Sequence, residues 1–368
     1  MTVLDVGVVG CGNLAQVVHL PNLMRLSDRF RLRGLCDIDP RARELVAASY
    51  PGVPIHADVA DLVAMPLDAV LIITTGNHLR ELTVAAEAGL HVFLEKPICL
   101  TAGEAALAVA AVEHAGITTS VGYMKRHSPG TLQAARTLPE LGRLLSISCE
   151  LWHPPQDRYL AGHGARTRPP GTDGFESGMR SLVTTGPIGQ ALEDSLGVDA
   201  TLEQRIAYFL LVTVGIHEIN LLRAFVGEPV RTAMDVWHGG FGGQVRLTFP
   251  NDVPATFTWL FPPSGSHHEL LAFVGERGRL QVRYPPPYLP LVPVTVEWER
   301  DGPGGAISSG SVIAGHEDPF KQELLAFHAA VTEGAPVTTT VADAAADLAL
   351  IREATLGAAP APAMAAPA

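Results

Sequence analysis

The sequence predicts an α/β protein with two domains, a parallel sheet in the first and an antiparallel sheet in the second. The chain of 368 residues is long enough for two domains. Over its first third, short apolar runs alternate with helical stretches, which is typical of βαβ units with helices on both faces of the sheet. Beyond residue 230, several β-rich runs follow one another without a helical stretch between them, which indicates antiparallel pairing.

The first domain is expected over residues 1–124. Its first helix, at 13–26, is expected to be interrupted near Pro21, because proline has no N–H to donate. The other elements follow from the same alternation: strands at 3–9, 31–36, 67–75, 91–95 and 117–122, and helices at 41–49, 79–88 and 102–114.

The second domain is expected over residues 125–356, and the tail 357–368 is expected to be disordered because it is rich in alanine and proline. A Pro/Gly-rich stretch at 154–200 is predicted to be a functional or disordered loop. An apolar stretch at 206–226 predicts a buried helix. The remaining predictions are strands at 144–152, 230–237, 244–249, 255–261, 269–274, 280–284 and 292–298, and helices at 318–331 and 341–356, the last of which is expected to pack back towards the first domain.

Composition argues against several classes of partner. The formal net charge is −12 and no basic stripe is present, which argues against nucleic acid and against an anionic membrane surface. The sequence shows neither a secretory signal nor a run of about 20 uncharged apolar residues. Its four scattered cysteines form no CxxC pair, and its histidines show no metal-ligand spacing. We therefore expect a cytoplasmic protein without a metal site.

A glycine motif follows the first predicted strand. Gly10, Gly12 and Ala15 form the pattern G-x-G-x-x-A at the start of a predicted helix. Gly10 permits a tight turn, Gly12 lets the backbone approach a pyrophosphate, and Ala15 allows close packing of helix and strand. The helix N-terminus, with Asn13 and Leu14, presents free N–H groups to the phosphates.

An acidic residue ends the second predicted strand, as dinucleotide binding requires. Asp37 lies where a carboxylate accepts hydrogen bonds from the adenosine ribose. Together with Asp39 it would repel a 2′-phosphate, which favours NAD over NADP. Arg41 and Arg43 follow closely and leave NADP as the alternative.

Four segments resemble the Gfo/Idh/MocA family, the glucose–fructose oxidoreductases, inositol dehydrogenases and their relatives. The most specific segment is the predicted strand that ends in Glu95, Lys96 and Pro97. The others are TTGNH at 74–78, GYMKR at 122–126 and GIHEIN at 215–220. The resemblance covers residues 1–150 and 206–356 and is weakest over 154–205. It implies a Rossmann domain followed by an α/β domain with a large, mainly antiparallel open sheet, and it implies a homodimer or homotetramer.

The resemblance also implies an activity and a set of site residues. The expected activity is hydride transfer between NAD or NADP and a secondary alcohol of a sugar, cyclitol or derivative. Lys96 is expected to face the reacting oxygen and His217 to exchange the proton, and the residue chemistry agrees, since lysine stabilises a developing negative charge and histidine titrates near neutrality. Further cofactor contacts are expected from Thr75, Asn77, His78, Glu95 and Arg126, and substrate contacts from Tyr123 and Trp152.

The sequence departs from the family at two positions near the predicted site. Thr213 and Asn220 stand where typical dehydrogenases of this family have aspartates, and both are candidate substrate contacts here. His217 would thereby lose a carboxylate that raises its pKa. The candidates for a replacement from the long segment are Asp157, Tyr159, Asp173 and Glu176.

The long segment also carries several cations. A phosphate, such as that of a nucleotide-activated sugar, is one ligand that they would fit, and a solvated loop is the alternative. These residues are His153, Arg158, His163, Arg166 and Arg168.

Three functions are therefore kept open. The first is a freely exchanging NAD(P)-dependent dehydrogenase or reductase that acts on a sugar, cyclitol, aminocyclitol or nucleotide sugar. The second is a redox-neutral enzyme, such as an epimerase or glycosidase, that keeps and recycles its NAD. The third is a non-catalytic dinucleotide or sugar sensor built on the same fold.

Overall fold

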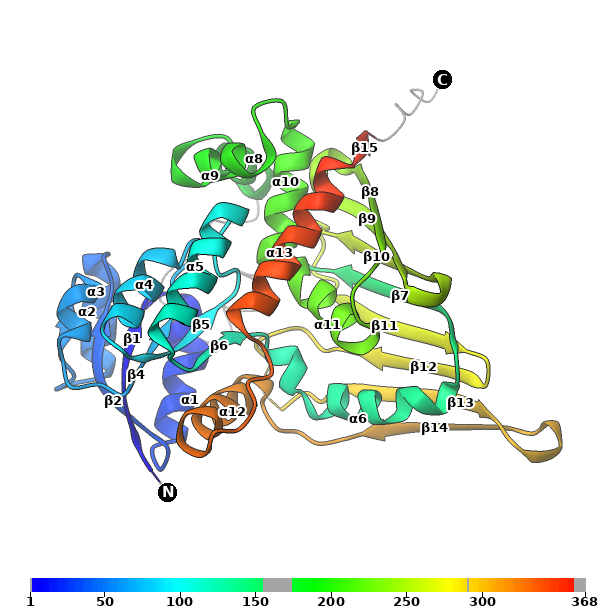
Figure 1. Ribbon diagram of the computed structural model, residues 1–368, viewed down its shortest axis with the longest axis horizontal. Helices are drawn as coiled ribbons and strands as arrows, with labels where there is room; N and C mark the ends of the chain where they lie inside the picture. The colour runs from blue at the N-terminus through cyan, green and yellow to red at the C-terminus, as the bar shows by residue number, and fades with distance from the viewer. Residues whose placement is uncertain (1, 155–173, 290, 361–368) are drawn as a thin grey trace.

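The first domain is a six-stranded sheet in which every pair of neighbouring strands is parallel, in the order β3-β2-β1-β4-β5-β6 (Figure 1). The computed structural model describes residues 2–154, 174–289 and 291–360. The strands are β1 (Leu4–Val9), β2 (Phe30–Cys36), β3 (Ile55–His56), β4 (Ala69–Ile72), β5 (His91–Glu95) and β6 (Thr119–Gly122). The helices are η1 (Ala15–His19), α1 (Leu20–Arg25), α2 (Pro40–Ser49), α3 (Val59–Val63), α4 (Leu79–Glu87) and α5 (Ala102–Ala115).

The interruption expected near Pro21 is wrong, because η1 runs directly into α1. η1 is a π-helical segment in which the N–H of Leu20 bonds to the carbonyl of Ala15. Pro21 lacks the N–H that an α-helix requires at that position. The wider π-turn immediately before the proline accommodates this missing donor, so the helix changes its hydrogen-bond pattern without ending.

The second domain is built on a nine-stranded open sheet in the order β14-β13-β12-β11-β7-β10-β9-β8-β15. Only the β7–β10 and β8–β15 pairs are parallel, so the predicted fold class is confirmed. The strands are β7 (Leu144–Trp152), β8 (Arg231–Trp237), β9 (Gly242–Phe249), β10 (Val253–Leu260), β11 (His268–Gly275), β12 (Gly278–Arg283), β13 (Thr295–Asp301), β14 (Ile307–Ile313) and β15 (Ala359–Pro360). The short β15 lies inside the tail that was predicted to be disordered.

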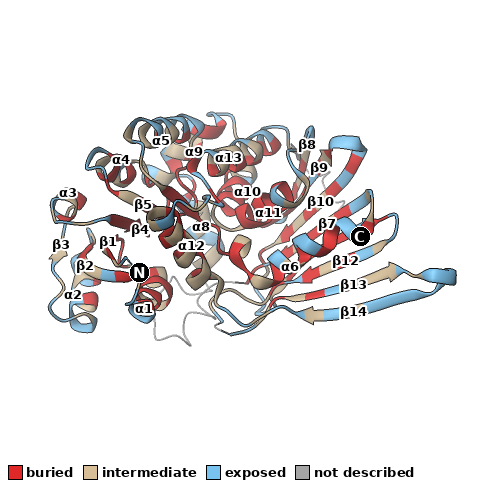
Figure 2. Ribbon diagram, turned by 60° about the horizontal axis from the view of Figure 1, so that its bottom comes forward, coloured by how far each residue is buried: buried red, intermediate tan, exposed pale blue. Residues whose placement is uncertain are grey.

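Helices cover one face of this sheet. Figure 2 shows that buried residues alternate with intermediate or exposed ones along strands such as β9 and β10, as is typical of a sheet covered on one face. The helical elements are η2 (Met124–His127), α6 (Pro129–Thr137), η3 (Leu138–Leu141), α8 (Phe175–Leu182), α9 (Gly186–Leu196), α10 (Leu202–Leu210), η6 (Leu211–Gly215), α11 (Ile216–Val226), α12 (Pro319–Glu333) and α13 (Val341–Leu356), together with the short 3-10 turns η7 (His238–Gly240), η8 (Pro250–Asp252) and η9 (Pro303–Gly305).

The predicted long loop is wrong for its second part. Residues 175–196 form α8 and α9, whereas residues 155–173 lie outside the described part of the chain. α8 is only eight residues long and α9 begins with Gly186 and Pro187, so the sequence pattern predicts a Pro/Gly-rich loop in place of the two short helices.

The most apolar helix of the described residues belongs to the core. Leu202–Val226 is continuous through α10, η6 and α11, and its length and composition alone would allow it to cross a membrane. Within its most apolar window, however, 72% is buried inside the protein. This burial against the sheet accounts for its hydropathy.

Two late helices join the domains. Leu324 and Phe327 of α12 belong to the same apolar core as Val6, Phe30 and Phe93 of the first domain. α13 packs against α5 of the first domain and against α10 and α11 of the second (Figure 1). The two sheets are therefore held by shared helices as well as by the crossing at β6.

Candidate active site

The glycine turn leaves room for a ligand. Gly10 has φ +91°, and a Cβ there would lie 2.6 Å from the amide nitrogen of Thr74, so only glycine fits. A Cβ at Gly12 would meet nothing within 4 Å, which means that the space above the turn is open. Asn13 and Leu14 begin the helix that continues into η1. Because backbone N–H groups at a helix start bind phosphate, this turn fits the pyrophosphate of a dinucleotide.

Asp37 lies beside the glycine turn. Its Oδ2 accepts a hydrogen bond from the amide of Cys11 at 2.7 Å, and its Oδ1 accepts one from the amide of Asp39 at 2.8 Å. The guanidinium of Arg43 donates to the carbonyl oxygen of Asp37 at 2.8 Å, whereas Arg41 is exposed. The carboxylate is thus fixed at the position where a ribose would follow the pyrophosphate.

The other expected cofactor contacts of the first domain lie at the carboxyl ends of β4 and β5. Thr75 is exposed, and the side-chain oxygen of Asn77 caps α4 through the amide of Leu79 at 3.0 Å. The Nδ2 of Asn77 donates to Glu104. His78 is buried and its Nε2 donates to the carbonyl oxygen of Thr74 at 2.8 Å. Burial lowers the pKa of His78, so its imidazole is neutral.

Lys96 reaches from the first domain into the second. It follows β5, and its Nζ donates to the carbonyl oxygen of Thr213 at 2.6 Å. Thr213 is the middle residue of the π-helical segment η6, and such segments occur often at functional sites. Burial lowers the pKa of the Lys96 ammonium; Glu95 opposes this shift and Lys125 adds to it.

His217 lies one turn further along the same helix, in α11. It is buried, and its ring meets the ring of Tyr123 edge to face at 5.8 Å. Burial and the charges of Lys96, Lys125 and His153 hold the pKa of His217 well below its usual value. The imidazole is therefore neutral at neutral pH and has the capacity to accept a proton.

One pocket brings these groups together at the boundary of the domains. Lys96 of the first domain and Thr213 and His217 of the second line its polar end. Its other walls come from η1 and α1, from the Pro-rich stretch after β12 and from the start of α12, and they include Val17, Val18, Asn22, Arg25, Met124, Leu151, Tyr284, Tyr288, Val292, Asp318 and Phe320. A concave pocket that combines apolar walls with convergent polar groups is typical of a small-molecule site.

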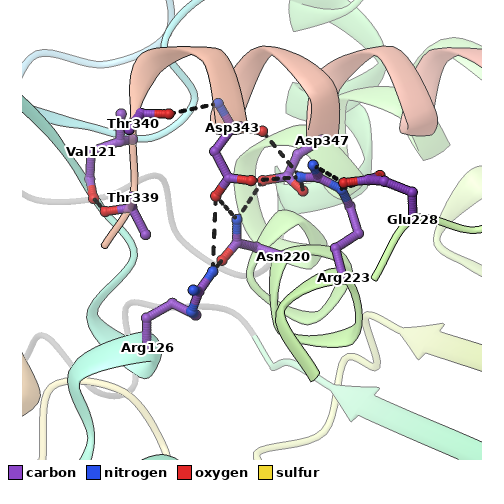
Figure 3. A network of polar contacts seen from close by, with 9 residues as sticks. All are labelled: Val121, Arg126, Asn220, Arg223, Glu228, Thr339, Thr340, Asp343 and Asp347. Atoms are coloured by element: carbon purple, nitrogen blue, oxygen red, sulfur yellow. Dashed lines mark hydrogen bonds and ion pairs between the residues drawn. The ribbon is translucent and has the colours of Figure 1, made fainter. Parts of the chain in front are cut away.

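Three of the four predicted substrate contacts and the predicted cofactor contact Arg126 do not line this pocket. Tyr123 is buried behind His217, and Trp152 is 40% exposed and packs against the ring of His268 at 4.5 Å. Arg126 and Asn220 meet each other at 2.9 Å in a separate polar network (Figure 3).

That network ties α11 to α13. The side-chain amide of Asn220 donates to Asp347 at 2.7 Å and to Asp343 at 3.1 Å. Arg223 pairs with the fully buried Asp347 at 2.5 Å and with Asp343 at 3.2 Å (Figure 3). Asn220 therefore serves the packing of α13 in this structure, as a neutral donor between two carboxylates.

Of the residues proposed to replace the aspartate expected at position 213, the structure describes only Glu176, which does not line the pocket. Asp157, Tyr159 and Asp173 lie outside the described residues, and Glu176 is exposed on α8. Among the cations of the same segment, His153 is buried and lines the pocket, whereas Arg158, His163, Arg166 and Arg168 lie outside the described residues.

The sequence alone did not reveal a buried ion-pair cluster at the pocket. The ammonium of Lys125 lies between the carboxylates of Glu218 and Glu269, at 2.5 Å from the latter. Glu269 lines the pocket, and Glu218 is buried beside His217 on α11. Glu269 occupies the inward register of β11 that Leu271 and Phe273 continue, so a charged residue in an otherwise apolar alternation was the available signal.

A second buried cluster lies behind Lys96. His19, Glu95 and Glu323 place ligand atoms within 4.8 Å of one another, and they are the one such group found in the described residues. The Nε2 of His19 bonds directly to Glu95 at 2.8 Å. Burial and the neighbouring Glu95 hold the pKa of Glu323 well above its usual value, so this group is a neutral carboxylic acid beside a hydrogen-bonded pair.

Comparison with known proteins agrees with this architecture. Residues 4–123 match the model of the Gfo/Idh/MocA oxidoreductase family, described as having an NAD-binding Rossmann fold. The first domain is thus similar to this family over the residues that carry the glycine motif and the Glu95–Pro97 segment.

Individual relatives and solved structures extend the comparison. The uncharacterized oxidoreductase YrbE of Bacillus subtilis is 30% identical over 43% of this chain and 48% of its own. An inositol 2-dehydrogenase/D-chiro-inositol 3-dehydrogenase of Shouchella clausii is 31% identical over 39% of this chain and 43% of its own. This chain thus spans less than half the length of each. KijD10, a 3-ketoreductase from Actinomadura kijaniata solved with TDP-benzene and NADP, covers 98% of this chain and 99% of its own with a TM-score of 0.70 at 20% identity, which shows a common fold.

Proposed function

We propose that this protein is an NAD(P)-dependent oxidoreductase that transfers a hydride between nicotinamide and a secondary alcohol or ketone of a sugar, cyclitol, aminocyclitol or nucleotide sugar. The observation that supports it is the meeting of Lys96 and His217, from different domains, in one pocket. When bound, the dinucleotide supplies the hydride acceptor or donor. The open space at Gly12 and the carboxylate of Asp37 beside it support dinucleotide binding by the first domain.

The chain's own residues supply charge stabilisation and a proton acceptor. Lys96 is oriented by the carbonyl of Thr213, and its ammonium stabilises negative charge that develops on a reacting oxygen. His217 is neutral and fits the role of accepting the proton of a hydroxyl group. His217 is 6% exposed, and this low exposure to water strengthens its interactions in the pocket.

For the cofactor, Asp37 favours NAD and the exposed Arg41 leaves NADP open. The solved 3-ketoreductase holds NADP together with a nucleotide-linked compound, and the inositol dehydrogenase is named for a cyclitol. These two names support a carbohydrate-like substrate, which ranges from a free cyclitol to a nucleotide sugar. A cytoplasmic location and a homodimer or homotetramer stay predictions. The four cysteines are free and buried, so the described residues contain no disulfide bond.

The first experiment is a titration of the purified protein with NADH and NADPH, after any co-purified dinucleotide has been measured. Binding of either, followed by substrate-dependent change in NAD(P)H absorbance with cyclitols, sugars or nucleotide sugars, is the expected result. Absence of binding, in protein free of bound dinucleotide, would contradict the proposal.

A redox-neutral enzyme is the second candidate. Thr213, which leaves His217 without the carboxylate expected from the family resemblance, and the long Pro/Gly-rich segment motivate it. Such an enzyme converts substrate without accumulating NADH and retains its dinucleotide during purification. Stoichiometric NADH formation excludes it.

A further inference from the structure

The carboxyl group of Glu269 lines the pocket on the side of the sheet. Glu269 lies on β11, opposite Leu151 of β7, and both side chains line the pocket. The other acidic residues that line it, Glu317 and Asp318, precede α12 on the far wall, where Asp318 caps that helix through the amide of Phe320. Glu269 is 3% exposed and faces the same pocket as Lys96 and His217.

Two carboxylates at this place share a single cation. Lys125 pairs with both Glu269 and Glu218, and all three side chains are almost completely shielded from solvent. One oxygen of Glu218 is buried without a hydrogen-bond partner. One ammonium balances one carboxylate, so the cluster carries an uncompensated negative charge unless it binds a proton. Like charges held together in a buried site favour protonation of one of them.

The surroundings of Glu269 favour a proton on this residue. Titratable groups face it from the neighbouring elements: Lys125 from η2, Glu218 from α11, Cys149 from β7, His153 directly after β7, Tyr284 after β12, and His267 before β11. Burial, with Glu218 acting in the same sense and Lys125 opposing, raises the pKa of Glu269 to about 8. His153 and His267 are neutral, because burial lowers their pKa values to about 4 and about 3.

His217 needs such a partner. Three potential cations, Lys96, Lys125 and His153, surround it, and no carboxylate stands at Thr213 to stabilise an imidazolium. A proton that reaches His217 is therefore held poorly and must pass on. A polyol substrate carries hydroxyl groups that can link the reacting oxygen at Lys96 to a carboxyl group elsewhere in the same pocket.

We propose that Glu269 is the group of this pocket that binds a substrate hydroxyl and supplies the proton for carbonyl reduction, and that in alcohol oxidation it takes back the proton that His217 has accepted. The inference rests on the proposed function. The C–H bond at the carbon that bears the hydroxyl breaks, and its hydrogen leaves with both electrons, as a hydride, to an oxidised nicotinamide dinucleotide. The O–H proton is accepted by His217 and passes on, through hydroxyl groups of the substrate, to Glu269 in its carboxylate form, and a carbonyl group forms. In the reductive direction the carboxylic acid returns the proton.

The first test needs neither cofactor nor substrate. Infrared spectra of the full-length protein between pH 6 and 9 are compared with those of Glu269→Gln. We expect a carbonyl band of a protonated carboxylic acid that disappears around pH 8, is missing in Glu269→Gln, and persists in the control Glu276→Gln, whose exposed side chain pairs with Arg143. A spectrum of Glu269→Gln identical to that of the wild type contradicts the proposal.

A second variant tests the shared cation. Glu218→Gln leaves Lys125 to Glu269 alone, so we expect the midpoint of the same titration to fall by at least one pH unit. An unchanged midpoint contradicts the electrostatic argument.

The kinetic test separates this role from the proposed function. With a substrate found in the screen, Glu269→Gln is expected to lower kcat by about 100-fold or more and to flatten the pH profile, with unchanged binding of NADH. Normal NADH binding together with full activity of Glu269→Gln contradicts the role of Glu269 alone. Failure of the wild type to bind a dinucleotide contradicts the proposed function and this role with it.

Discussion

The side-chain nitrogen of Lys96 lies 2.6 Å from the carbonyl oxygen of Thr213, so a residue that ends a strand of the first domain is oriented by the main chain of the second. Where typical family members have a carboxylate side chain, this protein has a backbone carbonyl in a π-helical turn. A carbonyl orients an ammonium group as a carboxylate does, but it does not neutralise its charge.

Replacement of Lys96 by methionine is expected to abolish turnover without harm to the fold. Loss of one charge-stabilising donor lowers kcat by about 100- to 1000-fold. The buried ammonium carries a desolvation cost that lowers its pKa, so the melting temperature of Lys96→Met is expected to equal or exceed that of the wild type. Calorimetry checks the melting temperature, and initial rates check the loss of turnover. Wild-type turnover by Lys96→Met would refute the assigned role.

Introducing a carboxylate at Thr213 is expected to shift the pH dependence. In Thr213→Asp, the new negative charge near Lys96 and His217 raises the pKa values of both groups, so the pH profile of kcat/KM moves to higher pH. Thr213→Asn has the same shape without the charge and is the matched control. An equal shift in both variants would show that shape, and not charge, is responsible.

Asp37→Ala is expected to weaken NADH binding more than NADPH binding. The carboxylate orders the glycine turn through Cys11 and faces the expected ribose. Hydrogen bonds that involve a charged group contribute about 1.5–3 kcal/mol, which corresponds to a Kd that rises roughly tenfold to hundredfold. Asp58→Ala, which removes an exposed helix-capping carboxylate at α3, is the control. Equal losses for the two dinucleotides would argue that Asp37 only shapes the turn.

Arg223→Ala is expected to destabilise the protein strongly. It leaves Asp347, which is fully buried, without its cation, and such losses cost about 3–5 kcal/mol. Glu228→Ala removes an exposed partner of the same arginine and is expected to cost about 0–1 kcal/mol. Urea unfolding of the two variants measures this difference. Similar midpoints for both would mean that Asp347 finds another partner.

The stability of the wild type relative to Glu269→Gln is expected to fall as the pH rises. The pKa of Glu269 is raised from 4.5 to about 8 by folding, so the folded state keeps a proton that the unfolded state has lost. The favourable contribution of that proton is complete below the unfolded pKa and is lost as the pH rises through about 8. Urea unfolding of both proteins at pH 6 and pH 9 gives the comparison. A difference that does not change with pH would contradict the raised pKa.

The parts of the fold that were predictable are those with continuous apolar runs and clear caps. The bounds of β5 and α13 were predicted to the residue, because a buried parallel strand and a helix capped by Thr340 leave strong local patterns. β14 was missed because its serines and glycine carry no apolar alternation and it is an exposed edge strand.

The parts of the site that were missed depend on contacts between distant positions. Glu269 and Lys125 are separated by 144 residues, and Asn220 and Asp347 by 127. No single-sequence pattern shows that such pairs meet. The sequence was sufficient to recognise the glycine motif, Lys96 and His217, because each belongs to a short local motif.

The packing of α12 has a consequence for how this chain can be divided. Leu324 and Phe327 complete the apolar core around Phe30 and Phe93, so the stretch that matches the family model does not contain its whole interior. A fragment that stops at residue 124 would present an unfilled apolar socket to water and would be prone to aggregate. A chimera that takes its dinucleotide-binding domain from a relative would therefore have to include α12 of that relative as well. The two domains are distinct in structure, but they are not contiguous in sequence.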